Sequence, residues 1–209
     1  MEPAREGDSK KSKPRWPIAL LVAVGVSCWL ACLCGGFAAA NASKIYQFSL
    51  NRTSLKVGTL APDFEAPSLS GGTVRLSQFR GEPVLLTFGT TWCPDCVAEA
   101  PVVQALHEEH PELVVLLVDS NESRGTVQDF VDEYGLTYPV LLDSNGSISR
   151  QYQIFAIPTG LFIDAEGVIQ AKVVESVTPE LLEDKLPLIG VDPYANPGAP
   201  HLQSYRWSP

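Results

Sequence analysis

The chain has 209 residues, 45% of them hydrophobic, which is enough for one globular domain with appended segments but not for two sizeable cores. Its formal net charge of -9 argues against a general nucleic-acid partner, because phosphate binding requires clustered Lys and Arg. No such cluster occurs beyond residues 1–15.

A basic segment comes before a long apolar one at the start of the chain. Residues 18–40 are almost wholly apolar, and at about 1.5 Å per residue they are long enough to cross a hydrocarbon core about 30 Å thick. Basic residues that precede a span tend to stay in the cytoplasm. We therefore predict a cytoplasmic N-terminus over residues 1–15, a transmembrane anchor over 16–41, and an extracytoplasmic location for the remainder.

A cleaved signal peptide is the alternative for this segment. Ala38-Ala39-Ala40 and Ala40-Asn41-Ala42 both fit the small-x-small pattern of a cleavage site. The apolar run is long for a signal peptide, however, which favours a retained anchor on a single-pass membrane protein. Both interpretations export the domain.

A polar tether over residues 42–57 leads into the predicted globular domain, residues 58–190. Near the start of this domain, the turn sequence Ser70-Gly71-Gly72 separates two short strand-like pieces. This pattern predicts an N-terminal β-hairpin extension that leads into residues 76–79.

The remaining elements of the domain alternate between strands and helices. In chain order we predict a strand at 83–88, a helix at about 94–110, a strand at 113–118, a helix near 126–134, a strand at 139–142, a short helix at about 148–152, a β-hairpin from 161–163 and 168–174, and a last helix at 179–186. This order predicts an α/β fold with a central mixed β-sheet flanked by helices. The Pro-rich residues 191–209 are predicted to form a disordered tail.

The cysteines divide between the apolar segment and the domain. Cys28, Cys32 and Cys34 lie in the apolar segment, where a thiol usually serves as a small apolar side chain. Cys93 and Cys96 belong to the domain. A disulfide that closes so short a loop removes little chain entropy, so this pair makes a weak structural cross-link and a better redox switch.

A zinc site is a second possibility for the pair, because His107 and His110 follow the two cysteines. Residues 97–109 contain no turn signal, and a helix from Cys96 to His107 would separate them by about 16 Å. Zinc ligands lie about 2.1–2.3 Å from one ion. The spacing therefore argues against a metal site, and we predict none.

The helix that begins at this pair predicts a role for each sulfur. Unsatisfied backbone N–H groups at a helix N-terminus favour a thiolate, and Cys93 stands at the predicted cap with Pro94 in the first turn. Cys96 lies one turn into the helix, where we expect it to be less exposed. These positions predict that Cys93 is the nucleophile and that Cys96 resolves the mixed disulfide.

The sequence Trp92-Cys93-Pro94-Asp95-Cys96, at the end of a predicted strand, resembles the active site of the thioredoxin superfamily. Ile157-Pro158-Thr159 is similar to the superfamily's cis-proline loop, which faces the active cysteines. Gly58-x-x-Ala61-Pro62-Asp63-Phe64 resembles the N-terminal hairpin of redoxins and of the membrane-tethered TlpA/ResA-like proteins. In that branch an acidic residue followed by x-Pro belongs to the active site, and Glu99-Ala100-Pro101 matches it. The resemblance implies a thioredoxin-like fold whose active site contains Cys93, Cys96, Glu99 and Pro158.

Two departures from thioredoxin affect the predicted chemistry. Thr87 stands where thioredoxin has a buried acid before the first cysteine, which leaves Glu99 to handle a proton near Cys96. The alternative for Glu99 is a solvent-exposed carboxylate that stabilises a helix start. Asp95 lies between the cysteines, where its charge disfavours a neighbouring thiolate and moves the pair toward the reducing side.

The residues predicted to contact the substrate flank the cysteines and the cis-proline. They are Trp92, Pro94, Ile157 and Thr159. For Trp92, simple packing is an equal alternative. The backbone beside Pro158 is expected to align the substrate by strand-like hydrogen bonds.

Two other classes of protein share parts of this pattern. A peroxiredoxin-like thiol peroxidase has a threonine three residues before its cysteine, and Thr90 fits, but Leu86 replaces the proline of that motif. A Sco-like copper-binding protein spaces its cysteines four apart and adds a distant His, whereas this pair is three apart. Both alternatives fit less well than disulfide exchange.

The sequence therefore predicts an extracytoplasmic, membrane-tethered thiol-disulfide oxidoreductase that acts on partner proteins as a reductase. Dithiol–disulfide exchange requires no metal and no organic cofactor. The resemblance implies a transmembrane thiol carrier as electron donor, and apocytochrome c or other extracytoplasmic disulfide proteins as substrates.

Overall fold

The computed structural model describes residues 55–195. The predicted cytoplasmic segment, the transmembrane anchor, most of the tether and residues 196–209 of the predicted tail lie outside this range. Within the described range, no helix is both long and apolar enough to cross a membrane.

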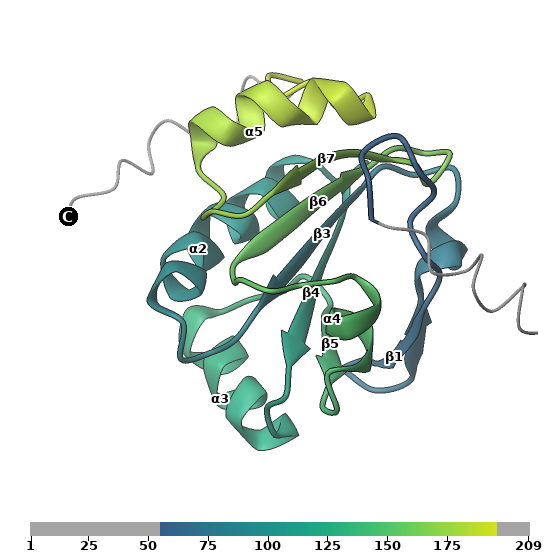
Figure 1. Ribbon diagram of the computed structural model, residues 1–209. Coiled ribbons are helices and arrows are strands. Elements are labelled where there is room, and N and C mark those ends of the chain that lie inside the picture. The colour runs from purple at the N-terminus through teal and green to yellow at the C-terminus, as the bar shows by residue number, and fades with distance from the viewer. Residues whose placement is uncertain (1–54, 196–209) are drawn as a thin grey trace, which may run out of the picture. The chain divides into compact units, whose positions relative to one another are not determined.

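A five-stranded mixed sheet forms the centre of the domain, as predicted, with the strand order β5-β4-β3-β6-β7 (Figure 1). β3 (Val84–Gly89), β4 (Val114–Ser120) and β5 (Val140–Asp143) run parallel. β6 (Thr159–Ile163) pairs antiparallel with β3, and β7 (Ile169–Val173) pairs antiparallel with β6. Every residue of β3 is buried, because other elements cover both faces of this central strand.

Three helices cover one face of the sheet: α2 (Pro94–Glu109), α3 (Arg124–Tyr134) and α5 (Pro179–Lys185). A 3-10 helix at Leu186–Ile189 continues α5. The short helix α4 (Ser147–Gln151) lies on the other side of the sheet (Figure 1). Helices therefore flank both faces, as the order of elements predicts.

Local sequence sets the ends of the surface helices. Ser123 Oγ accepts a hydrogen bond from the Thr126 N–H at the start of α3, and Thr178 Oγ1 does the same for the Leu181 N–H at the start of α5. Gly135 ends α3 with a φ of 62°, a left-handed conformation that favours glycine. These caps satisfy backbone groups that the helices cannot satisfy themselves.

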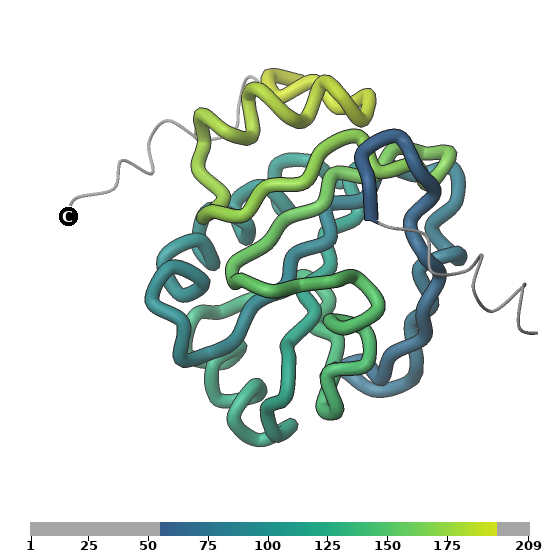
Figure 2. The backbone as a smooth tube through the Cα atoms, viewed as in Figure 1, coloured from purple at the N-terminus to yellow at the C-terminus, as the bar shows by residue number. Residues whose placement is uncertain are grey.

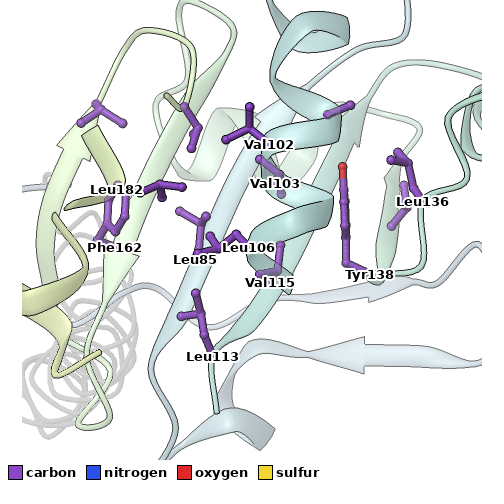
Figure 3. Close-up of a cluster of buried hydrophobic side chains, with 14 of the residues drawn as sticks. Leu85, Val102, Val103, Leu106, Leu113, Val115, Leu136, Tyr138, Phe162 and Leu182 are labelled. Carbon is purple, nitrogen blue, oxygen red and sulfur yellow. The ribbon is translucent and has the colours of Figure 1, made fainter. Parts of the chain in front are cut away.

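The first hydrophobic core lies between this helical layer and the sheet (Figure 3). Leu106 of α2 shares it with Leu85 of β3 and Val115 of β4, and all three are almost completely buried. Leu182 of α5 is buried in the same cluster. Val191 also packs there, so the domain extends past residue 190, where the sequence predicts a tail. This burial of apolar surface is a main source of the domain's stability.

A second core fills the other face of the sheet. The Tyr152 ring lies 5.8 Å from the Phe64 ring and 5.4 Å from the Phe88 ring, measured between centroids. The Tyr152 hydroxyl donates a hydrogen bond to the Pro62 carbonyl. The aromatic cluster thereby joins the N-terminal segment, β3 and the end of α4.

The N-terminal segment forms a short antiparallel hairpin from β1 (Glu65–Pro67) and β2 (Thr73–Arg75), followed by a 3-10 helix at Leu76–Phe79. Gly71 and Gly72 in the connecting turn have φ values of 102° and 74°, which glycine adopts without steric cost. Figure 2 shows this blue segment along the same side of the sheet as α4.

The carboxyl ends of β3 and β4 meet at the start of α2. Their parallel register pairs Gly89 with Asp119. A Cβ atom on Gly89 would lie 3.3 Å from Cys96 Sγ, so the end of β3 approaches the first turn of the helix closely. The fold therefore brings the polar ends of two strands to the cysteine pair.

Candidate active site

The two domain cysteines occupy the first turn of α2, as predicted. Cys93 is the N-cap residue and Pro94 is the first residue of the helix. Cys93 Sγ accepts a hydrogen bond from the Cys96 backbone N–H, at an N···S distance of 3.3 Å. Both cysteines are free thiols. The helix start thus directs one of its backbone donors at the Cys93 sulfur.

The exposure of the two cysteines differs from the prediction. Cys93 is 5% exposed and Cys96 is 7% exposed, so Cys96 is not the less exposed residue of the pair. Cys93 lies 3.9 Å from the Ile157 carbonyl oxygen, measured from Sγ, and its thiol donates to that oxygen. The neighbouring loop covers Cys93, an effect of tertiary packing that position in a helix does not reveal.

The Ile157–Pro158 peptide bond is cis, as the sequence predicts. Pro158 and Thr159 are buried, and Ile157 is half-buried. The Thr159 hydroxyl donates to the Ala156 carbonyl over 2.7 Å, so this side chain holds the loop in shape. The antiparallel pairing of Thr159 with Phe88 of β3 brings the loop beside the strand that leads to Cys93.

Apolar side chains that lie close in sequence to Cys93 and to the cis-proline are exposed. Trp92 is 70% exposed, which favours a role as a contact surface over simple packing. Pro94 is exposed as well. Phe155, in the loop before the cis-proline, is 92% exposed. Phe155 is not among the residues predicted from the sequence, although its place three residues before Pro158 is a local signal for it.

Glu99 is buried within α2, which excludes the alternative of a solvent-exposed carboxylate. It is 5% exposed, and its Oε2 accepts a hydrogen bond from the Val177 backbone N–H over 2.8 Å. Burial raises the pKa of Glu99 from 4.5 to about 7; the Asp95 charge adds to this rise, and the Val177 hydrogen bond opposes it. The carboxyl group is therefore suited to accept or donate a proton near neutral pH.

Cys96 and Glu99 line the same small pocket. Burial raises the pKa of the Cys96 thiol above its ordinary value, and its hydrogen bond with Cys93 and the charges of Cys93 and Glu99 raise it further. A backbone hydrogen bond at Thr90 opposes these effects. Cys96 thus holds its proton firmly and needs a nearby base to become a nucleophile.

Asp119 is a second buried acid at this pocket and is not among the residues predicted from the sequence. It is 2% exposed at the end of β4 and lines the pocket with Cys96 and Glu99. Burial raises its pKa from 3.8 to about 8, with further contributions from a hydrogen bond and repulsion at Glu122 and from the charge of Asp143. The available signal was its position, because carboxyl ends of neighbouring parallel strands share one edge of a sheet.

Glu122 fixes the turn that carries Trp92 and Cys93. Its two carboxylate oxygens accept from the Thr91 backbone N–H over 2.6 Å and from the Thr91 hydroxyl over 2.8 Å. Thr91 and Glu122 are far apart in the sequence, so no local pattern indicated this contact. The carboxylate links the loop after β4 to the start of the active-site helix.

Residues 57–172 match the model of the AhpC/TSA family. The chain belongs to the AhpC/TSA family. Its sequence is 36% identical over 149 residues to the thioredoxin-like protein YneN of Bacillus subtilis. This match covers 69% of this chain and 87% of YneN. It is 31% identical over 160 residues to the thiol-disulfide oxidoreductase ResA of Bacillus thuringiensis, covering 75% of this chain and 90% of ResA.

A solved structure resembles this chain in fold and comes from a protein of the same kind of activity. A secreted disulfide oxidoreductase of Mycobacterium tuberculosis, homologous to E. coli DsbE, matches with a TM-score of 0.56 and 28% identity, over 59% of this chain and 94% of that one. This AhpC/TSA protein is accordingly an oxidoreductase with a thioredoxin-like sheet. It is similar to the ResA-like members of the family.

The AhpC/TSA fold brings most of the predicted site residues together at one corner. Cys93, Cys96 and Glu99 share the first two turns of α2, and the cis-proline loop contacts Cys93. Thr159 is the exception among the predicted substrate contacts, because its side chain is turned to the loop itself. Within residues 55–195, no group of three or more His, Cys, Asp or Glu side chains has an arrangement that could hold a metal ion.

Proposed function

We propose that this protein reduces disulfides in partner proteins outside the cytoplasm, with Cys93 as the nucleophile and Cys96 as the resolving thiol. The hydrogen bond from the Cys96 N–H to Cys93 Sγ is the observation that carries this assignment. A donor directed at a sulfur stabilises negative charge on it, and the thiolate is the form that attacks disulfides. The names of the relatives, thiol-disulfide oxidoreductases among them, support the same activity.

The first step forms a mixed disulfide. The Cys93 thiolate attacks one sulfur of the substrate disulfide, a bond forms between the two sulfurs, and the substrate S–S bond breaks. The departing substrate sulfur leaves as a thiolate and takes a proton from solvent. Cys93 then carries one half of the substrate covalently.

The second step releases the substrate. Glu99 accepts the Cys96 proton, the Cys96 sulfur attacks Cys93 Sγ, and the bond between Cys93 and the substrate breaks. A base is needed here because burial raises the pKa of Cys96, and Glu99, with a pKa of about 7, lines the same pocket. The substrate gains two electrons, and the enzyme retains a Cys93–Cys96 disulfide.

Substrate binding uses the surface around Cys93. The backbone beside Ile157 and Pro158 lies next to the nucleophile and is suited to pair with an extended substrate segment. Trp92 and Pro94 are exposed beside it and provide apolar contact area. A polypeptide with an exposed disulfide fits this surface, and nucleic acid does not fit the acidic chain.

We also propose that residues 16–41 anchor the domain to the membrane from the extracytoplasmic side. The length of the apolar run at 18–40 and the basic residues before it support this orientation. The secreted M. tuberculosis relative supports an exported location. In that setting a transmembrane thiol carrier would reduce the Cys93–Cys96 disulfide, and apocytochrome c or another exported disulfide protein would be the substrate.

Disulfide reduction by the purified protein tests the catalytic part of this proposal. The wild type is expected to reduce a protein disulfide, Cys93→Ser to lose this activity, and Cys96→Ser to accumulate a covalent mixed disulfide visible by mass spectrometry. Activity retained by Cys93→Ser would reject the assignment of the nucleophile. Turnover of hydrogen peroxide, or firm retention of copper, without disulfide exchange would favour one of the two alternative classes.

Topology is tested separately in cells. A reporter that is active only outside the cytoplasm, fused after residue 57, should be active, and replacement of the basic residues before the span should reduce the signal. Activity of a cytoplasm-specific reporter at the same fusion point would contradict the orientation.

A further inference from the structure

The small pocket beside Cys96 contains two buried polar atoms that lack a partner. Its cavity volume is about 10 Å³, and Thr90, Cys96, Glu99 and Asp119 are among the residues that line it. Within residues 55–195, Thr90 Oγ1 and Asp119 Oδ1 are buried and make no hydrogen bond. Buried polar atoms without partners are costly, and about 10–15 Å³ is enough for one water molecule. The pocket therefore has the size and the polar atoms that suit one bound water.

We propose that Asp119 is a second proton acceptor for Cys96, and that a water molecule held by Thr90 Oγ1 and Asp119 Oδ1 carries the proton between them. This inference rests on the proposed exchange at the Cys93–Cys96 pair and adds a residue to its second step. It also gives a role to Asp119, a buried acid that the fold brings to this pocket.

The charged and titratable groups around Asp119 favour this role. Glu122 faces it from the loop after β4, Asp143 from β5, and Cys96 and Glu99 from α2. Burial, followed by the hydrogen bond and repulsion at Glu122, raises the pKa of Asp119 to about 8. A carboxylate with a pKa in this range is a stronger base than an ordinary aspartate and better matched to a thiol.

The proposed step balances in protons and electrons. The Cys96 S–H bond breaks, and its proton passes through the water to the Asp119 carboxylate. The Cys96 sulfur forms a bond with Cys93 Sγ, the bond between Cys93 and the substrate breaks, and the substrate sulfur leaves with the electron pair. Asp119 later releases its proton through Glu122, which is only half-buried and so provides a path to solvent.

Single-turnover kinetics separates the two steps of exchange. The reduced full-length protein is mixed with the disulfide dithiobis(nitrobenzoate), which releases one coloured thiolate when Cys93 attacks and a second when Cys96 resolves. The signal of the Cys93→Ser/Cys96→Ser variant is subtracted to remove the contribution of Cys28, Cys32 and Cys34. In the wild type, the rate constant of the second phase should rise with pH through about 7 and again through about 8.

Asp119→Asn removes the proposed acceptor while keeping the shape of the side chain. We expect the second phase to slow about tenfold at a pH of about 8, because general-base catalysis is typically worth two orders of magnitude or more and Glu99 still contributes. The first phase should stay within about twofold of wild type, because Cys93 is the group that reacts in it. Thr90→Val, which removes only the hydroxyl partner of the water, should slow the second phase over the same pH range.

Asp129→Asn is the matched control, because it makes the same chemical change at an exposed position of α3. Both of its phases should match wild type. A second phase of Asp119→Asn with the wild-type rate and pH dependence overturns the inference. Absence of the first phase in the wild type would instead overturn the proposed function, so the two failures are distinguishable.

Glu99→Gln gives an independent test if Asp119→Asn does not fold. With the Glu99 carboxyl removed, a rise in the second phase near a pH of about 8 should remain, since we assign it to Asp119. A second phase that is independent of pH in Glu99→Gln overturns the inference.

Discussion

The backbone N–H of Cys96 donates to Cys93 Sγ over 3.3 Å, across the first turn of α2. This contact makes the two sulfurs chemically unequal, although both are buried to a similar degree. A donor of this kind stabilises negative charge on the Cys93 sulfur. At Cys96, burial and the neighbouring charges raise the pKa and outweigh a backbone hydrogen bond at Thr90 that lowers it. The helix start therefore directs a backbone donor at Cys93, whereas Cys96 needs a base before its sulfur can react.

Substitution of Trp92 should affect protein substrates more than small ones. Because Trp92 is 70% exposed, we expect Trp92→Ala to change the free energy of unfolding by less than about 0.5 kcal/mol. The value of kcat/KM for a protein disulfide should fall about tenfold, because truncation of an aromatic residue at an interface typically costs that much affinity. The value of kcat/KM for a small aliphatic disulfide should not change. Phe155→Ala should behave in the same way.

The control for these variants is Leu188→Ala, an exposed apolar position in the 3-10 helix after α5. It should leave kcat/KM for both substrates at the wild-type value. Equal losses on the protein and the small disulfide in Trp92→Ala would contradict a role in substrate contact.

Replacement of Glu99 should change how stability depends on pH. Burial raises the pKa of this carboxyl from 4.5 to about 7 in the folded state. Between these values the unfolded chain releases a proton that the folded domain retains, so stability falls as pH rises and the loss is complete above about 7. The rise in pKa corresponds to a loss of about 3 kcal/mol in the free energy of unfolding. Glu99→Gln should lack this loss because its side chain does not titrate.

Urea unfolding at several pH values between about 4 and 8 measures this effect. Glu166→Gln, at an exposed position in the β6–β7 turn, should follow the wild-type dependence. Parallel stability curves for wild type and Glu99→Gln would show that the Glu99 pKa is not raised by folding.

Removal of Glu122 should destabilise the turn before Cys93. Glu122→Ala leaves the Thr91 N–H and hydroxyl without their acceptor. We expect a loss of roughly 1–3 kcal/mol in the free energy of unfolding, measured in urea, because two half-buried donors of Thr91 lose a charged acceptor. Glu133→Ala, on the exposed side of α3, should stay within about 0.5 kcal/mol of wild type. A loss no larger than that of the control would contradict the role of Glu122 in fixing this turn.

Neutralisation of Asp95 should make the cysteine pair more oxidising. The Asp95 carboxylate repels negative charge in the site, an effect already visible in the raised pKa of Glu99. Asp95→Asn therefore favours the thiolate-containing reduced form, which raises the reduction potential by an amount on the order of 10 mV for an exposed charge. Equilibration with glutathione buffers measures the potential, and Asp129→Asn is the matched control. A shift to a more negative potential would refute the proposed direction.

The order of helices and strands was predictable from local patterns. Short apolar runs marked β3, β4 and β5, and the Pro-Asp-Cys sequence after β3 marked the start of α2. These features depend on residues that are neighbours in the chain, so hydrophobic periodicity and helix-start signals were sufficient. The same signals gave Cys93 its cap position, whereas the cis bond at Pro158 was implied by the resemblance to the thioredoxin superfamily.

The electrostatic character of the site was decided by tertiary structure. Glu99 becomes a buried acid because the segment at Val177, far along the chain, packs over it and donates a hydrogen bond. Asp119 reaches the Cys96 pocket because β3 and β4 end side by side in parallel register. Burial and pKa depend on which distant segments exclude water from a group, and a linear pattern of residue types carries no record of that packing. The sequence alone determined which sulfurs stand at the helix start, and only the folded chain determined which acids stand close enough to exchange protons with them.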